Sequence, residues 1–184
     1  MNGGGLKAST LQKLLESTYT GNEVEGFTID KTISSNETRV YVSNTTPHVI
    51  VAHTGTYSVS DWKYNAVYAV GGQSLYKLTP RYTRAKVIQK KAERKYGSKN
   101  ISTTGHSQAG LLAQLLGEHT REIITLNKAT RPQDILQLSK PSKQYDVRIN
   151  GDIVSVWGNT FLKKNTTTIK KKIIISYQNT PQMY

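Results

Sequence analysis

Apolar and polar residues recur along the chain with two different periods, and these periods predict helices and strands. Leu6, Leu11, Leu14 and Leu15 recur at helical spacing, which predicts an amphipathic helix over Leu6–Thr18. Short runs of β-branched and other apolar residues are instead typical of strands. The predicted strands are Thr38–Ser43, Val49–His53, Asn100–Thr104, Glu122–Leu126, Tyr145–Ile149 and Lys172–Tyr177.

Helical patterns separate several of these strands. Pro80–Tyr96 is the clearest helix, because a proline stands in its first turn and Gly97 follows its last residue. Gln108–His119 is rich in Leu and Ala, and Ser60–Tyr68 also fits a helix. The strand Val49–His53 is strongly apolar, which predicts a central place in a sheet. Strands alternating with helices predict an α/β fold with a mainly parallel central sheet and helices on both faces.

The length of 184 residues fits a single domain over 1–184, with 1–26 as an N-terminal helical segment and 172–177 as the final strand. No apolar run reaches the length of about 18 residues that a membrane-spanning helix needs. The first residues lack the apolar core of a secretory signal. The absence of cysteine excludes disulfides, thiolate zinc sites and cysteine nucleophiles, and no metal or other cofactor is predicted.

The chain is strongly basic, with 25 Lys and Arg against 12 acidic residues and a net charge of +13. This charge predicts attraction to nucleic acid, to anionic lipid or to acidic protein surfaces such as a capsid. Tyrosines are interleaved with the cations between Tyr76 and Tyr96, a pattern that occurs in nucleic-acid binding but is more typical of a solvated helix face. The cations of this segment are Arg81, Arg84, Lys86, Lys90, Lys91, Arg94 and Lys95.

A short motif joins a predicted strand to a predicted helix. Residues 105–110 read GHSQAG and consist of Gly105, His106, Ser107, Gln108, Ala109 and Gly110. A GxSxG-like motif between strand and helix is typical of a nucleophile elbow, where small residues let the turn pack closely. Ala109 stands where a second glycine is usual, at the cost of one methyl group. The motif predicts Ser107 as a nucleophile.

A serine nucleophile needs a base and an orienting acid, which this fold places downstream in the order Ser, Asp, His. Asp152 follows the predicted strand Tyr145–Ile149, where an acid would project from the end of a strand, although it also fits a capping residue of the turn. Asp146 and Asp134 are weaker candidates for the acid.

Histidine is scarce in this chain. Its four histidines are His48, His53, His106 and His119, so none follows Asp152. His119 lies 12 residues after Ser107, more than three helical turns away at about 1.5 Å per residue. It is predicted to interact with the dipole at the end of the helix rather than to serve as the base.

Four ordered blocks together resemble the fungal-lipase-type, or class 3 lipase, family, particularly its short members from large DNA viruses and their satellite viruses. The blocks are Val49–Asn65, Ile101–Gly117, Leu126–Asp134 and Gln144–Gly158. The resemblance implies an α/β-hydrolase fold and a serine esterase that acts on an ester or lipid substrate. It also implies a lid over residues Tyr64–Thr79, which are short here and rich in aromatics.

The resemblance also assigns roles to individual residues. Thr54, Gly55 and Thr56 match the family's RGT segment, so the amides of Thr56 and Gln108 would form the oxyanion hole, with Thr54 in place of the usual Arg. Asp152 matches the family's acid. The family's histidine follows the final strand, where residues 178–184 contain none. The alternative is an inactive structural or virion protein with a basic binding surface, located in the virion or the infected-cell cytoplasm.

Overall fold

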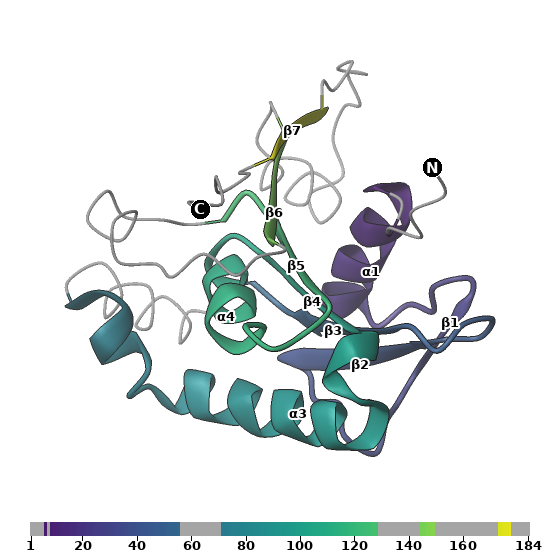
Figure 1. Ribbon diagram of the computed structural model, residues 1–184, viewed down its shortest axis with the longest axis horizontal. Helices are drawn as coiled ribbons and strands as arrows, with labels where there is room; N and C mark the ends of the chain where they lie inside the picture. The colour runs from purple at the N-terminus through teal and green to yellow at the C-terminus, as the bar shows by residue number, and fades with distance from the viewer. Residues whose placement is uncertain (1–5, 7, 56–70, 129–143, 150–172, 178–184) are drawn as a thin grey trace, which may run out of the picture.

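The computed structural model describes residue 6 and residues 8–55, 71–128, 144–149 and 173–177. Its centre is a seven-stranded sheet in which the strands lie in sequence order, as Figure 1 shows. The strands are β1 (Phe27–Ile29), β2 (Thr38–Ser43), β3 (Val49–His53), β4 (Ile101–His106), β5 (Glu122–Leu126), β6 (Gln144–Ile149) and β7 (Ile173–Tyr177). The bounded helices are α1 (Ala8–Thr20), α3 (Pro80–Tyr96) and α4 (Gln108–Leu116), and residues 71–76 are also helical.

The four middle strands, β3 to β6, run parallel, whereas β1, β2 and β7 are antiparallel to their neighbours. The α/β-hydrolase-like fold with a parallel centre and helices is therefore confirmed. All residues of β3 and β4 are buried, as their apolar composition predicts for central strands. Because the carboxyl ends of parallel strands meet at one edge of a sheet, side chains that follow β3, β4, β5 and β6 gather there.

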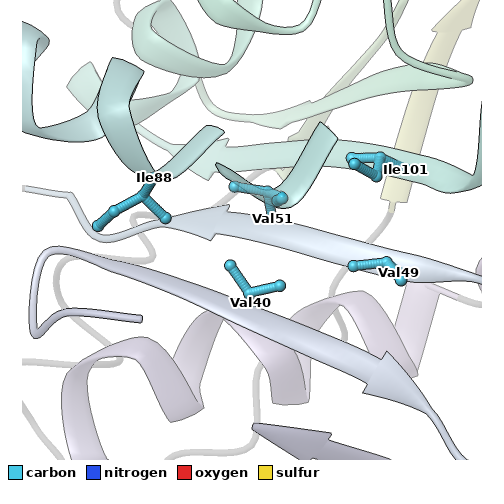
Figure 2. Packing of buried hydrophobic residues seen from close by; sticks show 6 residues of the cluster. Val40, Val49, Val51, Ile88 and Ile101 are labelled. Carbon is cyan, nitrogen blue, oxygen red and sulfur yellow. The ribbon is translucent and has the colours of Figure 1, made fainter. Parts of the chain in front are cut away.

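Helices cover both faces of the sheet. On one face, Ile88 and Ala92 of α3 pack against Val40, Val49 and Val51 of the first strands, as Figure 2 shows in close-up for Ile88 and the three valines. On the other face the leucine stripe of α1 packs against the sheet, as the helical spacing of these leucines predicts. Leu14 packs in one cluster with Tyr41, Ile50 and Ala52. Leu11 and Leu15 pack in another cluster with Ile124 and Leu126.

Helix α3 begins and ends where its sequence predicts. The side chain of Thr79 accepts a hydrogen bond from the amide of Tyr82, and Pro80 occupies the first turn, where it needs no acceptor. At the other end Gly97, at φ 81°, donates its amide to the Glu93 carbonyl. These caps fix which residues of α3 face the sheet.

Several elements differ from their predicted limits, of which α1, β6 and β7 differ by only one or two residues at an end. β4 continues beyond Thr104 to His106, because Gly105 and His106 pair with β5 and Gly105 also pairs with β3. α4 ends at Leu116 because Gly117 caps it, so the prediction that His119 ends this helix is wrong, and His119 lies exposed in the following turn. β1 was not predicted, since it has only three residues. The predicted helix Ser60–Tyr68 and residues 64–70 of the predicted lid lie outside the described residues.

Candidate active site

Ser107 lies in the sharp turn between β4 and α4, at the carboxyl edge of the parallel strands. Its backbone has φ 55° and ψ −124°, a conformation that costs a residue other than glycine about 1–3 kcal/mol. The Ser107 amide donates to the Leu126 carbonyl at 2.9 Å, and the Ser107 carbonyl accepts from the Gly110 amide at 3.0 Å. These bonds hold the turn from both sides and leave the serine half-buried at the edge of the sheet.

Two glycines allow this turn to pack. A Cβ at Gly105 would collide with the carbonyl of Ala109, where backbone cannot move aside. A Cβ at Gly110 would lie 3.0 Å from the Cβ of Lys128, in the segment that follows β5. Close approach of backbone therefore requires glycine at Gly105, whereas at Gly110 the contact is only a tight one with a side chain, and Ala109 occupies its position in a fully buried turn of α4.

The segment after β3 passes directly beside this turn. A Cβ at Gly55 would lie 3.1 Å from the carbonyl of His106 and would collide with the hydroxyl of Tyr19. Thr54 is buried and held by the chain before β2, because its amide donates to the Glu37 carbonyl at 3.0 Å. Thr56 lies outside the described residues, but the residue before it is fixed against the elbow.

Arg81 holds the same segment from the opposite side. Its guanidinium donates to the Thr54 carbonyl and lies 3.6 Å from the carboxylate of Glu37. Arg81 is only 3% exposed, so its assignment to the exposed basic face of this helix was wrong. The sequence contained a signal: Arg81 lies on the same helical stripe as Ala85, Ile88 and Ala92, which face the sheet. A guanidinium from α3 thus reaches the segment that follows β3.

Gln108 is the first residue of α4. The first amides of a helix have no acceptor within the helix and lie at the positive end of its dipole, which suits a developing negative charge. The Gln108 side chain is buried, and its Nε2 has no hydrogen-bond partner among the described residues. The geometry is that of a donor site next to Ser107.

The predicted acid, Asp152, lies outside the described residues, three positions after the end of β6. Because β6 is parallel to β4 by way of β5, the chain leaves β6 at the edge where Ser107 lies. Asp134 also lies outside the described residues.

Asp146, the other candidate acid, lies within β6 and is already fully engaged. It accepts hydrogen bonds from Thr125 at 2.6 Å, from Gln144 at 2.8 Å and from Lys128 at 3.0 Å. Burial alone would raise the pKa of Asp146, but these hydrogen bonds and the Lys128 charge outweigh it and lower the pKa. Asp146 ties β5, β6 and the segment after β5 together.

His53 ends β3 and is completely buried. Its Nδ1 lies 3.0 Å from the hydroxyl of Thr38, and no partner of its Nε2 is found among the described residues. Burial, together with the nearby charge of Arg81, lowers the pKa of His53 to about 3. His53 is therefore neutral at physiological pH. His106 is buried beside Ser107 in the sequence, on β4 itself.

His48 belongs to a separate polar group at the amino edge of the sheet. Ser102 on β4 donates to the carboxylate of Glu122 on β5 at 2.6 Å, and His48 Nε2 lies 2.6 Å from the same Ser102 oxygen. Since the only hydroxyl proton goes to Glu122, His48 must donate to Ser102 and cannot accept its proton. Burial and the charge of Arg121 lower the pKa of His48, and the opposing effect of the Glu122 charge is smaller.

In the described part of the chain, no group of three His, Asp or Glu side chains could hold a metal ion. None of the helices in this part is long and apolar enough to cross a membrane.

Comparison with known proteins adds one finding. A family model described as phospholipase-like, for the Tle-like phospholipase domain, matches residues 3–160. The matched range contains β1 to β6, the elbow and Asp152. No curated protein and no solved structure matches the chain significantly. The match supports a hydrolase of the lipase and esterase type with a lipid substrate, on the fold that the sheet order shows.

Proposed function

Because the chain belongs to the family of Tle-like phospholipase domains, we propose that it hydrolyses acyl esters of phospholipids, with Ser107 as the nucleophile. The backbone of Ser107 carries this proposal. Its φ of 55° and ψ of −124° occur between a buried strand and a helix N-terminus, beside a glycine that no larger residue could replace. A strained backbone conformation persists only where the surrounding structure enforces it, and such conformations cluster at functional sites.

In the proposed reaction, Ser107 Oγ attacks the carbonyl carbon of an acyl ester while a general base removes the hydroxyl proton. The amides of Gln108 and Thr56 donate to the oxygen that becomes negative, and removing one such donor typically costs about 100- to 1000-fold in rate. Collapse of the intermediate breaks the bond to the lipid alcohol, which takes up the proton. Water then attacks the acyl-enzyme, releases the fatty acid and restores Ser107.

Asp152 is the proposed residue that orients the base. The direction of β6 supports this role, because the chain leaves that strand at the edge that holds Ser107. The saturation of Asp146 by three donors supports it as well. The base is expected to be a histidine in the family's pattern, and none of the four histidines follows Asp152.

The narrower placement among class 3 lipases, with their short viral members, stays a prediction, as do the single domain over residues 1–184 and a location in a virion or infected cell. The four sequence blocks that resemble class 3 lipases support this placement. The family match covers all four of these blocks, including the last, Gln144–Gly158.

The test is hydrolysis of a short-chain p-nitrophenyl ester and of a monomeric short-chain phosphatidylcholine. The proposal expects turnover of both by the wild-type chain, with release of fatty acid from the phospholipid, and loss of both activities in Ser107→Ala. Hydrolysis that survives in Ser107→Ala would refute the role of Ser107.

The alternative is a lipase-like protein without catalysis. The described histidines favour it, since His53 is buried at the Thr38 hydroxyl and His48 is bonded to Ser102. A wild-type chain that folds but turns over neither substrate would favour this alternative.

A further inference from the structure

Helix α3 carries a surface that the proposed chemistry does not use. Seven of its 17 residues are Lys or Arg, and only one is acidic. Arg81 faces the sheet, whereas the other cations are exposed because Ala85, Ile88 and Ala92 occupy the packed side. Figure 1 shows α3 as the outermost layer on its side of the sheet. The exposed cations are Arg84, Lys86, Lys90, Lys91, Arg94 and Lys95.

Acidic side chains neutralise only part of this surface. Arg84 is paired with Glu37, Lys90 with Glu93 and Lys95 with Asp30. No ion pair of Lys86, Lys91 or Arg94 is found among the residues that the structure describes. These three exposed cations are therefore available to an anionic partner.

Exposed apolar side chains lie on α3 and in the segment that leads into it. The large apolar residues that are exposed within the described chain are Leu75 at 46%, Leu78 at 77% and Val87 at 50%. Val87 lies among the cations of α3, while Leu75 and Leu78 flank the exposed Lys77 just before the helix. Apolar groups next to cations fit a lipid surface, where the apolar groups enter the acyl boundary and the cations meet the headgroups.

The tyrosines of this segment decide against nucleic acid. Single-stranded nucleic acid is bound by cations together with exposed aromatic rings on which bases stack. Here Tyr76 is fully buried, Tyr82 packs against the core around Leu112, and the Tyr96 hydroxyl donates to Asp30 at 2.7 Å. None of these three tyrosines is exposed, so the surface lacks a stacking platform.

The apolar end of this surface lies near the candidate active site. Arg81, in the first turn of α3, donates to the carbonyl of Thr54, which follows β3 at the edge that holds Ser107. Leu78 is only three residues before Arg81. A bilayer that contacts Leu78 would therefore meet the protein at the edge of the sheet where an ester must enter.

We propose that the docking surface formed by Leu75, Leu78, Val87, Lys86, Lys91 and Arg94 binds the surface of an anionic phospholipid bilayer. This proposal rests on the proposed function, because it names where the phospholipid substrate is presented. Each cation near an anionic membrane contributes a factor of about five to binding, so two contribute about 25-fold.

The experiment measures sedimentation of the full chain with phosphatidylcholine vesicles that contain or lack phosphatidylglycerol. Ser107→Ala is the background, so that hydrolysis cannot alter the vesicles. The proposal expects binding that requires phosphatidylglycerol and weakens as salt rises, because the Debye length falls. Lys86→Gln with Lys91→Gln should lower the partition coefficient about 25-fold.

Two further variants distinguish binding through this surface from attraction by the net charge of the whole chain. Lys13→Gln with Lys31→Gln removes the same charge from exposed positions outside α3, and Lys13 lies on the helix that covers the other face of the sheet. It should change the partition coefficient by about fivefold at most, since the charge of Lys13 on the other face is screened and Lys31 alone lies close to α3, beside the Asp30 that pairs with Lys95. Leu78→Ser should weaken binding by about fivefold or more, and this loss should persist at high salt.

Several outcomes would overturn the proposal. Equal losses in the two double-lysine variants would reduce the effect to net charge, and tight binding of an RNA oligonucleotide with none to vesicles would assign the surface to nucleic acid. Hydrolysis of the soluble p-nitrophenyl ester by the otherwise wild-type chain is measured in parallel. Ester hydrolysis without vesicle binding refutes the docking surface alone, and vesicle binding without ester hydrolysis refutes the proposed function alone.

Discussion

The two ends of β4 each carry a serine, and they differ in what surrounds it. At the amino end Ser102 is fully buried in regular strand and has both a histidine and a carboxylate within 2.6 Å. At the carboxyl end Ser107 is half-buried in a strained turn beside a helix N-terminus. Serine, histidine and a carboxylate thus occur together at the amino end of β4, but there the serine hydroxyl already donates its proton to Glu122. The proposed role of Ser107 therefore rests on its exposure, its strained backbone and the helix N-terminus beside it rather than on a nearby histidine and acid.

The largest expected effect separates these two serines. Ser107→Ala should lower ester turnover by about 10⁴-fold or more, because a serine hydrolase loses its nucleophile. Ser102→Ala should leave the rate constant for turnover within about twofold, while lowering the free energy of unfolding by about 1–3 kcal/mol, because His48 and Glu122 lose a buried partner. Assays of turnover and denaturant unfolding on both variants check this. A large rate loss in Ser102→Ala alone would reverse the comparison.

The next effect tests whether the elbow depends on its backbone. Gly105→Ala should lower the free energy of unfolding by about 3 kcal/mol, because its Cβ collides with the carbonyl of Ala109. Gly110→Ala is the matched control. Its Cβ meets the Lys128 side chain at 3.0 Å, and the better helix propensity of Ala offsets that contact, so the net change should be below about 1 kcal/mol. Equal losses measured by urea unfolding would contradict the geometry of the turn.

A third contrast concerns the two arginines at Glu37. Arg81 is buried and donates to the Thr54 carbonyl, whereas Arg84 is exposed and pairs with Glu37 through two bonds of 2.8 and 2.9 Å. Arg81→Gln should lower kcat on the soluble ester by about 10- to 100-fold with little change in KM, because the segment that leads to Thr56 loses its anchor.

Arg84→Gln should keep kcat within about twofold, because exposed ion pairs contribute little. Arg81→Lys should restore part of the rate, as expected of a positioning residue. If Arg81→Gln and Arg84→Gln lower kcat equally, Arg81 has no special effect on the segment.

A last contrast, which has its smallest effect near neutral pH, compares the histidines at the two ends of β3. The pKa of His53 is lowered to about 3, so between pH 6.5 and pH 4 the unfolded chain binds a proton there that the folded chain does not. Stability is therefore present above pH 6.5 and is lost as the pH falls, by about 1.4 kcal/mol per pH unit from this group. His53→Asn should remove this slope.

His48→Asn should change the slope in the same direction but less, since Glu122 opposes the lowering of the His48 pKa. Urea unfolding at a series of pH values measures both slopes. A slope that persists unchanged in His53→Asn would contradict the burial of a neutral His53.

Much of the fold was predictable because its local signals agree with its packing. The limits of β2, β3, β5 and α3 match the predictions, since each has a clear apolar period and a cap or turn at its ends. The end of β4 was not predictable from propensity. Gly105 and His106 extend only because β3 and β5 pair with them.

The candidate site was predictable where it is local and was missed where it is assembled in space. Residues 105–110 contain the whole elbow, so Ser107 could be found from the motif. The contact of Arg81 with Thr54 joins residues 27 positions apart, and only the inward stripe of α3 indicated it. Thr56 and Asp152 lie outside the described residues and stay predictions.

In the proposed mechanism Ser107, and not Ser102, is the nucleophile. The most direct test of this role is reaction of the folded chain with a fluorophosphonate, followed by peptide mapping in a mass spectrometer. We expect one adduct, on the peptide that contains Ser107, and none in Ser107→Ala. An unlabelled Ser107 in the folded chain, or an adduct on Ser102 instead, would contradict the account.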